Sequence, residues 1–190
     1  MVDPSAPQQE RSWKSKYKPV LETIQMIVMS LVLYFLIDSV LGRVRVQKIS
    51  MEPTLIPGEV LLVNKFAYKF DEIQYGDIIT FHYPVDPDLD YVKRIIGKPG
   101  DEVIVQEGSV WVNGQKLYEP FIINPPEYEG EWQVPEDGLF VLGDNRNPSA
   151  DSHVWGYVPL KNVIGKAFAV YWPPDKIRGL STPDVFFEIQ

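Results

Sequence analysis

The stretch that decides the fold is Tyr91–Gly97, YVKRIIG, an apolar segment that carries two cations. An acidic loop (residues 85–90) precedes it and the turn signal Lys98-Pro99-Gly100 follows it, so we expect one β-strand between two turns. Neighbouring side chains of a strand point to opposite faces, so one face must bury or pair a cation. Arginine stays protonated in proteins, whereas a desolvated lysine can become a base. Lys93 rather than Arg94 is therefore the candidate base, and the alternative is a lysine that snorkels at the edge of the body.

Short apolar segments between turns recur through the chain after Arg43 and predict a mainly β fold. The expected strands cover residues 60–63, 78–81, 91–96, 139–142 and 163–172, with a hairpin of 110–112 and 115–117 around Asn113-Gly114. Seventeen prolines and 13 glycines fit a body rich in turns, and no long helix is expected in it. Residues 119–137 are rich in Pro and Glu, and we expect their charges to lie on the surface.

An apolar segment precedes this body, with no charged residue between Glu22 and Asp38. Counted from Val20 to Leu41, it reaches the roughly 20 apolar residues that a bilayer requires. It is apolar all round, unlike the amphipathic helix of a soluble core. It also lacks the small-residue Ala-x-Ala pattern of a cleaved signal peptide, so we expect an uncleaved transmembrane anchor.

The domain organisation follows from this segment. We expect a cytoplasmic tail over residues 1–19, an anchor over 20–42 and an extracytoplasmic domain over 43–190, with a small β excursion at about 101–138. Basic residues are more numerous before the span (11, 14, 16 and 18) than after it (43, 45 and 48), which favours a cytoplasmic N-terminus.

Composition excludes several classes of function. The net charge of −8 and the pI of about 4.8 argue against a nucleic-acid partner, because phosphate binding needs a basic surface. The chain has no cysteine, so disulfides, thiol nucleophiles and thiolate metal sites are excluded. With only two histidines, His82 and His153, a histidine-rich metal site is not expected. We expect no metal and no cofactor.

A candidate nucleophile lies directly after the apolar segment, in ISMEPTL (Ile49–Leu55). The Ser50 hydroxyl needs a base before it can attack a carbonyl, and Lys93 is the candidate. The order anchor, serine, lysine suggests a peptidase at a membrane surface, whereas the alternative for Ser50 is a turn set by Pro53. A triad of Ser50 with Asp151 and His153 is less favoured, because an Asp and a His so close in sequence rarely face one reacting centre.

Together these features resemble type I signal peptidase, the membrane-bound Ser/Lys leader peptidase. The resemblance rests on the anchor, on Ser50–Leu55, on Tyr91–Asp101 and on GDNRNPSADS at Gly143–Ser152, in this order. The ending SHVWG at Ser152–Gly156 is similar to the cyanobacterial and thylakoid branch. The resemblance implies a β-rich catalytic core of the leader-peptidase type with a small β-hairpin excursion. It also implies a serine endopeptidase that removes signal peptides through an acyl-enzyme.

The same resemblance implies roles for individual residues. Ser50 would be the nucleophile, Lys93 the general base, and Ser149 the hydroxyl that orients the lysine amine. The residues expected to support the site are Asp144, Asn145, Arg146 and Asp151, with Arg94 as the ion-pair partner of Asp144.

Two positions depart from the family pattern. Lys48 stands where many relatives have a serine that helps to form the oxyanion hole, so the second oxyanion donor is left open. His153 stands where many relatives have an arginine that pairs with the aspartate at position 151, so we expect Asp151 to pair with Arg146 instead.

The implied partners are signal-peptide-bearing precursor proteins, membrane lipid and the secretion machinery. The implied location is the plasma or thylakoid membrane, crossed once. One alternative is a self-cleaving Ser/Lys repressor-type peptidase, which would need a DNA-binding segment in place of the anchor. Another is a non-catalytic, membrane-anchored β module that binds a partner and would tolerate the loss of Ser50 and Lys93.

Overall fold

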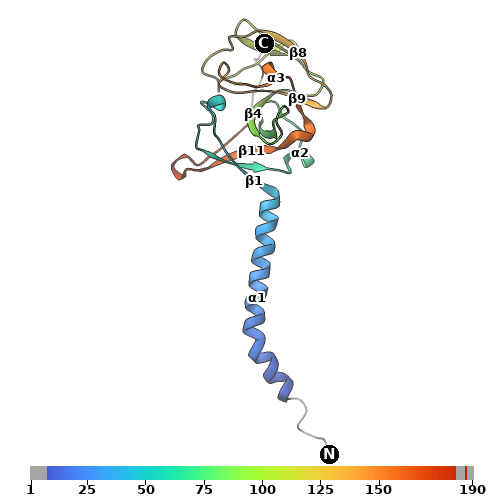
Figure 1. Cartoon of the computed structure of the whole chain (residues 1–190), viewed down its shortest axis with the longest axis vertical. Coiled ribbons are helices and arrows are strands. Elements are labelled where there is room, and N and C mark those ends of the chain that lie inside the picture. Colours follow the sequence, from blue (N-terminus) through green and yellow to red (C-terminus); the bar gives the residue numbers. More distant parts are fainter. Residues whose placement is uncertain (1–7, 183–186, 188–190) are drawn as a thin grey trace, which may run out of the picture. The chain divides into compact units, whose positions relative to one another are not determined.

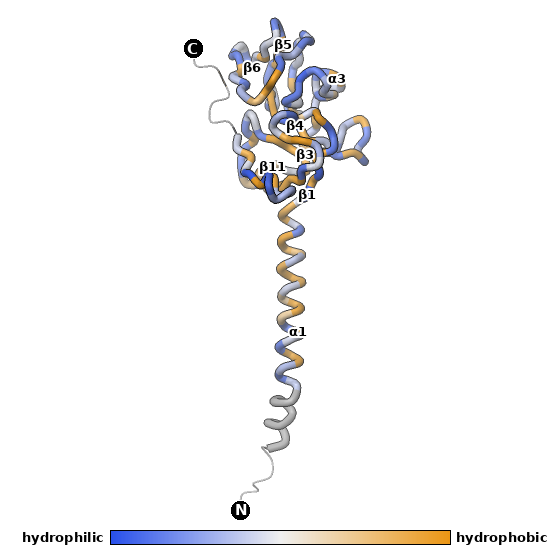
Figure 2. The backbone as a smooth tube through the Cα atoms, turned by 90° about the vertical axis from the view of Figure 1, so that its left-hand side faces the viewer, coloured by the Kyte–Doolittle hydropathy of each residue, from blue (hydrophilic) through white to orange (hydrophobic). Residues whose placement is uncertain are grey.

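The computed structural model describes residues 8–182 and Phe187, and the chain divides after Val40 into two compact units. The first unit contains helix α1 (Gln8–Val40), so the expected tail is helical from Gln8 onward, and its first seven residues lie outside the described part. Within α1, the 24 residues Tyr17–Val40 are long and apolar enough to cross a membrane. In Figure 2, orange, the colour of hydrophobic residues, recurs along this part of the helix.

The helix ends earlier than expected. Leu41 and Gly42 were assigned to the anchor, but they belong to the first strand of the second unit and pair there with Asn64 and Val63. Backbone pairing with a neighbouring strand takes the place of the next helical turn, so the apolar character of Leu41 gave no sign of the boundary.

The second unit is built on a large antiparallel sheet (Figure 1). Its strands lie in the order β1-β2-β11-β3-β4-β9-β10, with β12 paired to β11. The five single strands expected from apolar segments are present in it. The bounds are β1 (Leu41–Arg45), β2 (Val60–Asn64), β3 (Ile78–His82), β4 (Asp90–Gly97), β9 (Gly138–Leu142), β10 (Val158–Pro159), β11 (Val163–Trp172) and β12 (Arg178–Gly179).

A second, four-stranded sheet lies within the expected excursion, in the order β7-β6-β5-β8. Its strands are β5 (Glu102–Gln106), β6 (Ser109–Val112), β7 (Gln115–Lys116) and β8 (Gly130–Gln133). The expected hairpin joins β6 to β7 through Asn113 (φ 50°) and Gly114 (φ 77°). Positive φ at both turn residues is the geometry that Asn-Gly favours.

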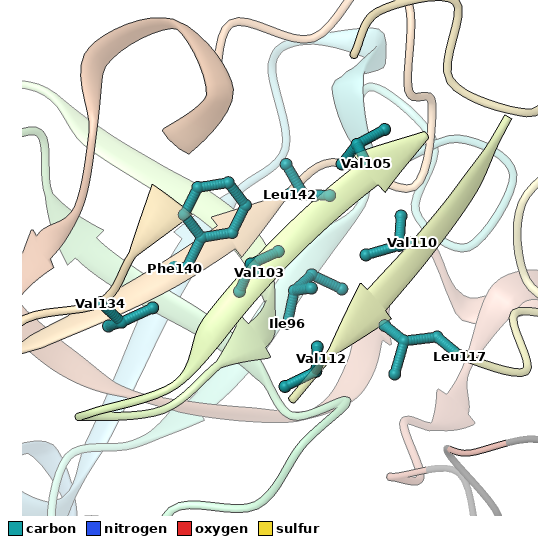
Figure 3. Close-up of a cluster of buried hydrophobic side chains, with 9 residues drawn as sticks. All are labelled: Ile96, Val103, Val105, Val110, Val112, Leu117, Val134, Phe140 and Leu142. Carbon is teal, nitrogen blue, oxygen red and sulfur yellow. The ribbon is translucent and has the colours of Figure 1, made fainter. Parts of the chain in front are cut away.

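The two sheets share a buried core (Figure 3). Alternate side chains of β5 and β6, such as Val103 and Val112, pack against Ile96 of β4 and Phe140 of β9. The excursion is therefore packed onto the strand that carries Lys93, and its position is fixed by apolar burial.

Among the described residues of the second unit, the helices are all short, and the sequence predicted no long helix there. They are η1 (Ile49–Met51), α2 (Ala67–Phe70), α3 (Ser152–Trp155), η2 (Leu160–Asn162) and η3 (Pro174–Lys176).

Candidate active site

The candidate nucleophile lies in a turn that the core holds in place. Ser50 is the middle residue of η1 and is partly buried. The next residue, Met51, is 1% exposed, and Leu55 is fully buried. The Ser50 carbonyl accepts a hydrogen bond from the Asn145 backbone N–H (3.1 Å), so this turn is tied to the segment after β9.

The candidate base is buried on a central strand. Lys93 lies on β4, between β3 and β9, and is 2% exposed, so it does not snorkel. Its Nζ donates a hydrogen bond to Ser149 Oγ (2.8 Å). Burial lowers the pKa of Lys93 to about 8; the cation of Lys48 adds to this effect, while the carboxylates of Asp151 and Asp144 oppose it. Desolvation disfavours the charged form, so a sizeable fraction of the amine is neutral near pH 8.

Ser50 and Lys93 line one cavity of about 750 Å³. The cavity is lined by residues 43–51, which include Ser50, by residues 88–93, which include Lys93, and by Pro148 and Ala150. A cavity of this size admits several residues of an extended peptide, and both candidate groups open onto it.

A glycine brings the nucleophile's turn and the lysine's partner together. An ideal Cβ built on Gly143 would lie 2.3 Å from both the Ser50 carbonyl oxygen and Ser149 Oγ. No real side chain fits at that distance, so glycine is the residue that lets these two groups approach. Position 143 therefore sets the spacing between the Ser50 turn and the Ser149 hydroxyl that bonds the Lys93 amine.

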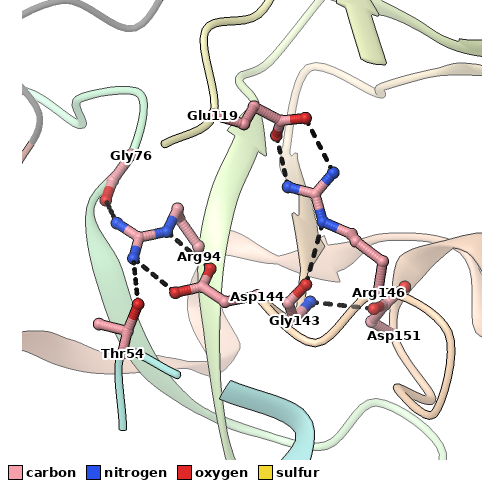
Figure 4. A network of polar contacts seen from close by, with 8 residues as sticks. All are labelled: Thr54, Gly76, Arg94, Glu119, Gly143, Asp144, Arg146 and Asp151. Atoms are coloured by element: carbon pink, nitrogen blue, oxygen red, sulfur yellow. Dashed lines mark hydrogen bonds and ion pairs between the residues drawn. The ribbon is translucent and has the colours of Figure 1, made fainter. Parts of the chain in front are cut away.

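Arg94, the neighbour of Lys93, is also buried, and it forms the ion pair expected from the sequence (Figure 4). Its Nε and Nη2 donate to the two carboxylate oxygens of Asp144 at 2.8 and 2.6 Å. Nη1 donates to the Gly76 carbonyl (2.8 Å). The bidentate pair joins β4 to the residue that follows Gly143, so it fixes the start of the segment that carries Ser149.

Arg146 and Asp151 do not pair with each other, so that expectation was wrong. The Arg146 side chain is fully buried and binds the Glu119 carboxylate, with Nη1–Oε2 at 3.0 Å. Asp151 instead accepts from His153 Nδ1 (2.5 Å), because it caps α3 and the first turn of that helix brings His153 back to it. Glu119 was expected on the surface, but its side chain is only 7% exposed, because the buried guanidinium needs a counter-charge.

The sequence of the chain matches a known family over most of its length. The model of the family described as signal peptidase, peptidase S26, matches residues 20–172. The chain belongs to this family. It is 43% identical to signal peptidase I of Leptolyngbya laminosa over 175 residues, which cover 87% of this chain and 86% of that protein.

Two further relatives come from a plant and from another bacterium. The chain is 41% identical to a probable thylakoidal processing peptidase 2 of Arabidopsis thaliana, over 69% of this chain and 38% of that protein. A crystal structure of a signal peptidase I from Enterococcus faecalis aligns with a TM-score of 0.47 and 30% identity, over 50% of this chain and 97% of that chain.

The two departures from the signal peptidase pattern have defined contacts. The Lys48 Nζ donates to the Tyr91 hydroxyl (3.2 Å) and lies 4.7 Å from the centre of that ring. His153 is bound to Asp151 and is not among the described residues that line the cavity with Ser50. Ser152 accepts from the backbone N–H of Val141 (2.9 Å), which is a structural contact inside the core. This arrangement favours the serine–lysine pair over the histidine triad.

The described residues also bear on metal binding. Among them, no group of three or more His, Asp or Glu side chains is arranged to hold a metal ion. At the cavity, the candidate groups for proton transfer and attack are the side chains of Ser50 and Lys93, and the lysine amine is bonded to the Ser149 hydroxyl.

Proposed function

We propose that Ser50 and Lys93 are the catalytic dyad of a membrane-bound serine endopeptidase that removes signal peptides from exported precursor proteins. The observation that carries this proposal is the buried Lys93 amine, which is bonded to Ser149 Oγ at 2.8 Å and opens onto the cavity that Ser50 lines. A lysine in that environment can give up its proton, and the chain has no cysteine that could replace Ser50 as nucleophile.

The reaction follows from the protonation states. Neutral Lys93 takes the proton of Ser50 as Oγ attacks the scissile carbonyl, and the hydrogen bond to Ser149 holds the amine in position. The resulting ammonium then protonates the leaving amine, and an acyl-enzyme remains on Ser50. Water attacks this ester with Lys93 again as the base, and Ser50 is regenerated.

The substrate class follows from the chemistry of precursors. Signal peptides end in small residues of the Ala-x-Ala type before their cleavage site, and an extended peptide of this kind fits a cavity of about 750 Å³. The secretion machinery would supply such precursors at the membrane where the enzyme resides.

The membrane topology is part of the proposal. The helix Tyr17–Val40 would cross the membrane once, with the N-terminus in the cytoplasm and the peptidase domain on the far side, in the plasma or thylakoid membrane. Because the chain has no cysteine, a single cysteine introduced at an exposed position such as Lys161 reports its side of the membrane without background. Labelling from the cytoplasmic side alone would contradict this topology.

A cleavage assay tests the dyad. The full-length protein in detergent is incubated with a signal-peptide-bearing precursor, and the N-terminus of the product is mapped. We expect cleavage at the end of the signal peptide, and we expect Ser50→Ala and Lys93→Met to abolish it while both variants stay folded. Matched controls are Ser181→Ala and Lys161→Met, because both residues are exposed.

The same assay separates the rival functions. Cleavage that persists in Ser50→Ala would rule out this serine as the nucleophile. A wild-type protein that binds precursors but never cleaves them would favour the non-catalytic β module.

A further inference from the structure

The backbone of Gly143 is held by hydrogen bonds on both sides of its α-carbon. Its N–H donates to Asp151 Oδ2 (2.9 Å), and its carbonyl accepts from Arg146 Nε (3.1 Å). Between these two bonds, the α-carbon lies against the Ser50 carbonyl and Ser149 Oγ. The two hydrogen bonds that hold the Gly143 backbone therefore also hold the position of the Ser149 hydroxyl, which binds the Lys93 amine.

Both holders are in turn held by one segment, the connection between β7 and β8 (residues 117–129), which we call the β7–β8 connection. Glu119 of this connection forms a two-bond ion pair with Arg146 (Figure 4). Tyr128 of the same connection stacks on His153, with ring centres 3.8 Å apart and planes 7° from parallel. His153 is the residue bound to Asp151.

Further contacts tie the same connection to the segment after β9. The backbone N–H of Glu127 donates to Asn147 Oδ1 (2.9 Å), and Asn147 Nδ2 donates to the Pro125 carbonyl (3.2 Å). The ring of Phe121 packs on Arg94 of β4, with its centre 3.9 Å from the guanidinium carbon, and Arg94 in turn pairs with Asp144 of that segment. The contacts extend from residue 119 to residue 128, so the connection supports the segment along its length.

We propose that Glu119 is a positioning residue for the dyad, which acts through Arg146 on the Gly143 peptide and hence on Ser149. This inference rests on the proposed function, because the place of Ser149 matters for the rate only if Lys93 is the base. Without the Glu119 carboxylate, the Arg146 guanidinium is an unpaired buried charge and must turn toward water. Gly143 then loses one of its two tethers.

The expected consequence reaches the amine of Lys93. A Ser149 hydroxyl that shifts away leaves room for water beside Nζ, and a better-solvated ammonium has a higher pKa. The charged groups that act on this amine are Lys48, Asp144 and Asp151, and none of them is removed by a change at Glu119. A shift of the acid limb of the activity profile would therefore report the displacement of Ser149 and not the loss of a neighbouring charge.

The test measures kcat and KM from pH 6 to pH 10 for the full-length protein in detergent. The key variant is Glu119→Gln, which keeps the shape and removes the charge. The control is Glu127→Gln, because Glu127 is an exposed carboxylate of the same connection and contacts Asn147 through its backbone. We expect Glu119→Gln to lower kcat by about tenfold or more at pH 7, the scale of a displaced catalytic group, with KM nearly unchanged.

The pH profile gives the decisive readout. In Glu119→Gln the acid limb of kcat should move to higher pH, so that the loss of activity shrinks above pH 9, while Glu127→Gln follows the wild type. A purely structural role would lower the melting temperature and leave the limb in place, and that result would overturn the proposal.

Two further variants keep the outcome unambiguous. If Glu119→Gln does not fold, Glu119→Leu combined with Arg146→Met removes both charges and leaves none unpaired, and we expect the same fall in kcat and the same limb shift. A folded double variant with the wild-type profile would refute the proposal. Ser50→Ala run in parallel separates the two levels. If it still cleaves, the dyad and this inference fall together; if it is inactive and Glu119→Gln matches the wild type, only this inference fails.

Discussion

Replacing Lys93 by methionine should abolish cleavage and yet stabilise the fold near neutral pH. Burial lowers the pKa of Lys93 from 10.5 to about 8. At 1.36 kcal/mol per pKa unit, the native state pays about 3 kcal/mol to keep a charged amine at this site. Methionine has a similar length and no charge, so it removes that penalty. The loss of the hydrogen bond to Ser149 destabilises the variant by about 1 kcal/mol and so offsets part of the gain.

The sign of the pH dependence follows from proton counting. The native pKa of Lys93 is below the unfolded value, so between about pH 8 and 10.5 the unfolded chain binds more protons and stability rises with pH. The penalty is complete below about pH 8 and disappears as the pH rises through 10.5. Lys93→Met should therefore be more stable than the wild type by about 2 kcal/mol at pH 7, and this advantage should vanish above pH 10.5.

Two measurements check this reasoning. Denaturant unfolding of both proteins in the same detergent, at pH 7 and at pH 11, gives the difference in the free energy of unfolding at each pH. The wild-type kcat/KM should rise roughly tenfold between pH 7 and pH 9, because only about a tenth of an amine with a pKa of about 8 is neutral at pH 7. A Lys93→Met protein that is less stable at pH 7, or an acid limb that ends below pH 6, would refute the assignment of a buried, neutral base.

Two other changes give separate outcomes. Gly143→Ala should lower cleavage by at least tenfold and destabilise the fold by about 1–3 kcal/mol, because the new Cβ would overlap the Ser50 carbonyl and the Ser149 hydroxyl. Cleavage assays and thermal unfolding measure the two effects. A Gly143→Ala protein with normal kcat would contradict the close approach. Lys48→Gln removes a cation that lowers the pKa of Lys93, so the acid limb of kcat/KM should move to higher pH, and an unmoved or more acidic limb would contradict it.

The sequence predicted the strands whose signals are local. β4 and the β6–β7 hairpin carry apolar residues with turn signals at their ends, and both were found where expected. β8 (Gly130–Gln133) was missed because GEWQ carries a single large apolar residue, Trp132, within a segment rich in Pro and Glu, and it forms a strand by pairing with β5. β1 was missed because its first residues continue the apolar character of the helix before it.

The site could be predicted to a similar extent. Ser50, Lys93 and Ser149 were predicted as candidates, because each lies in a motif of adjacent residues, and the structure forms the expected hydrogen bond between Lys93 and Ser149. The partner of Arg146 was not, because Glu119 is 27 residues away and its surroundings in the sequence are those of a solvated loop. An ion pair across such a separation leaves no local pattern, and only the packing of the small sheet on β4 brings the two side chains together.

The pairing of Glu119 with Arg146 also limits how this enzyme can be re-engineered. The stretch at about 101–138 looks like a cassette that could be trimmed to a short loop or exchanged with that of a homologue. Yet a graft without a carboxylate at the equivalent of Glu119 would leave the Arg146 guanidinium unpaired in the protein interior, which would destabilise the fold by about 3–5 kcal/mol. Donor inserts should therefore be chosen by whether they supply an acid at that point, and their length or sequence similarity is a secondary criterion.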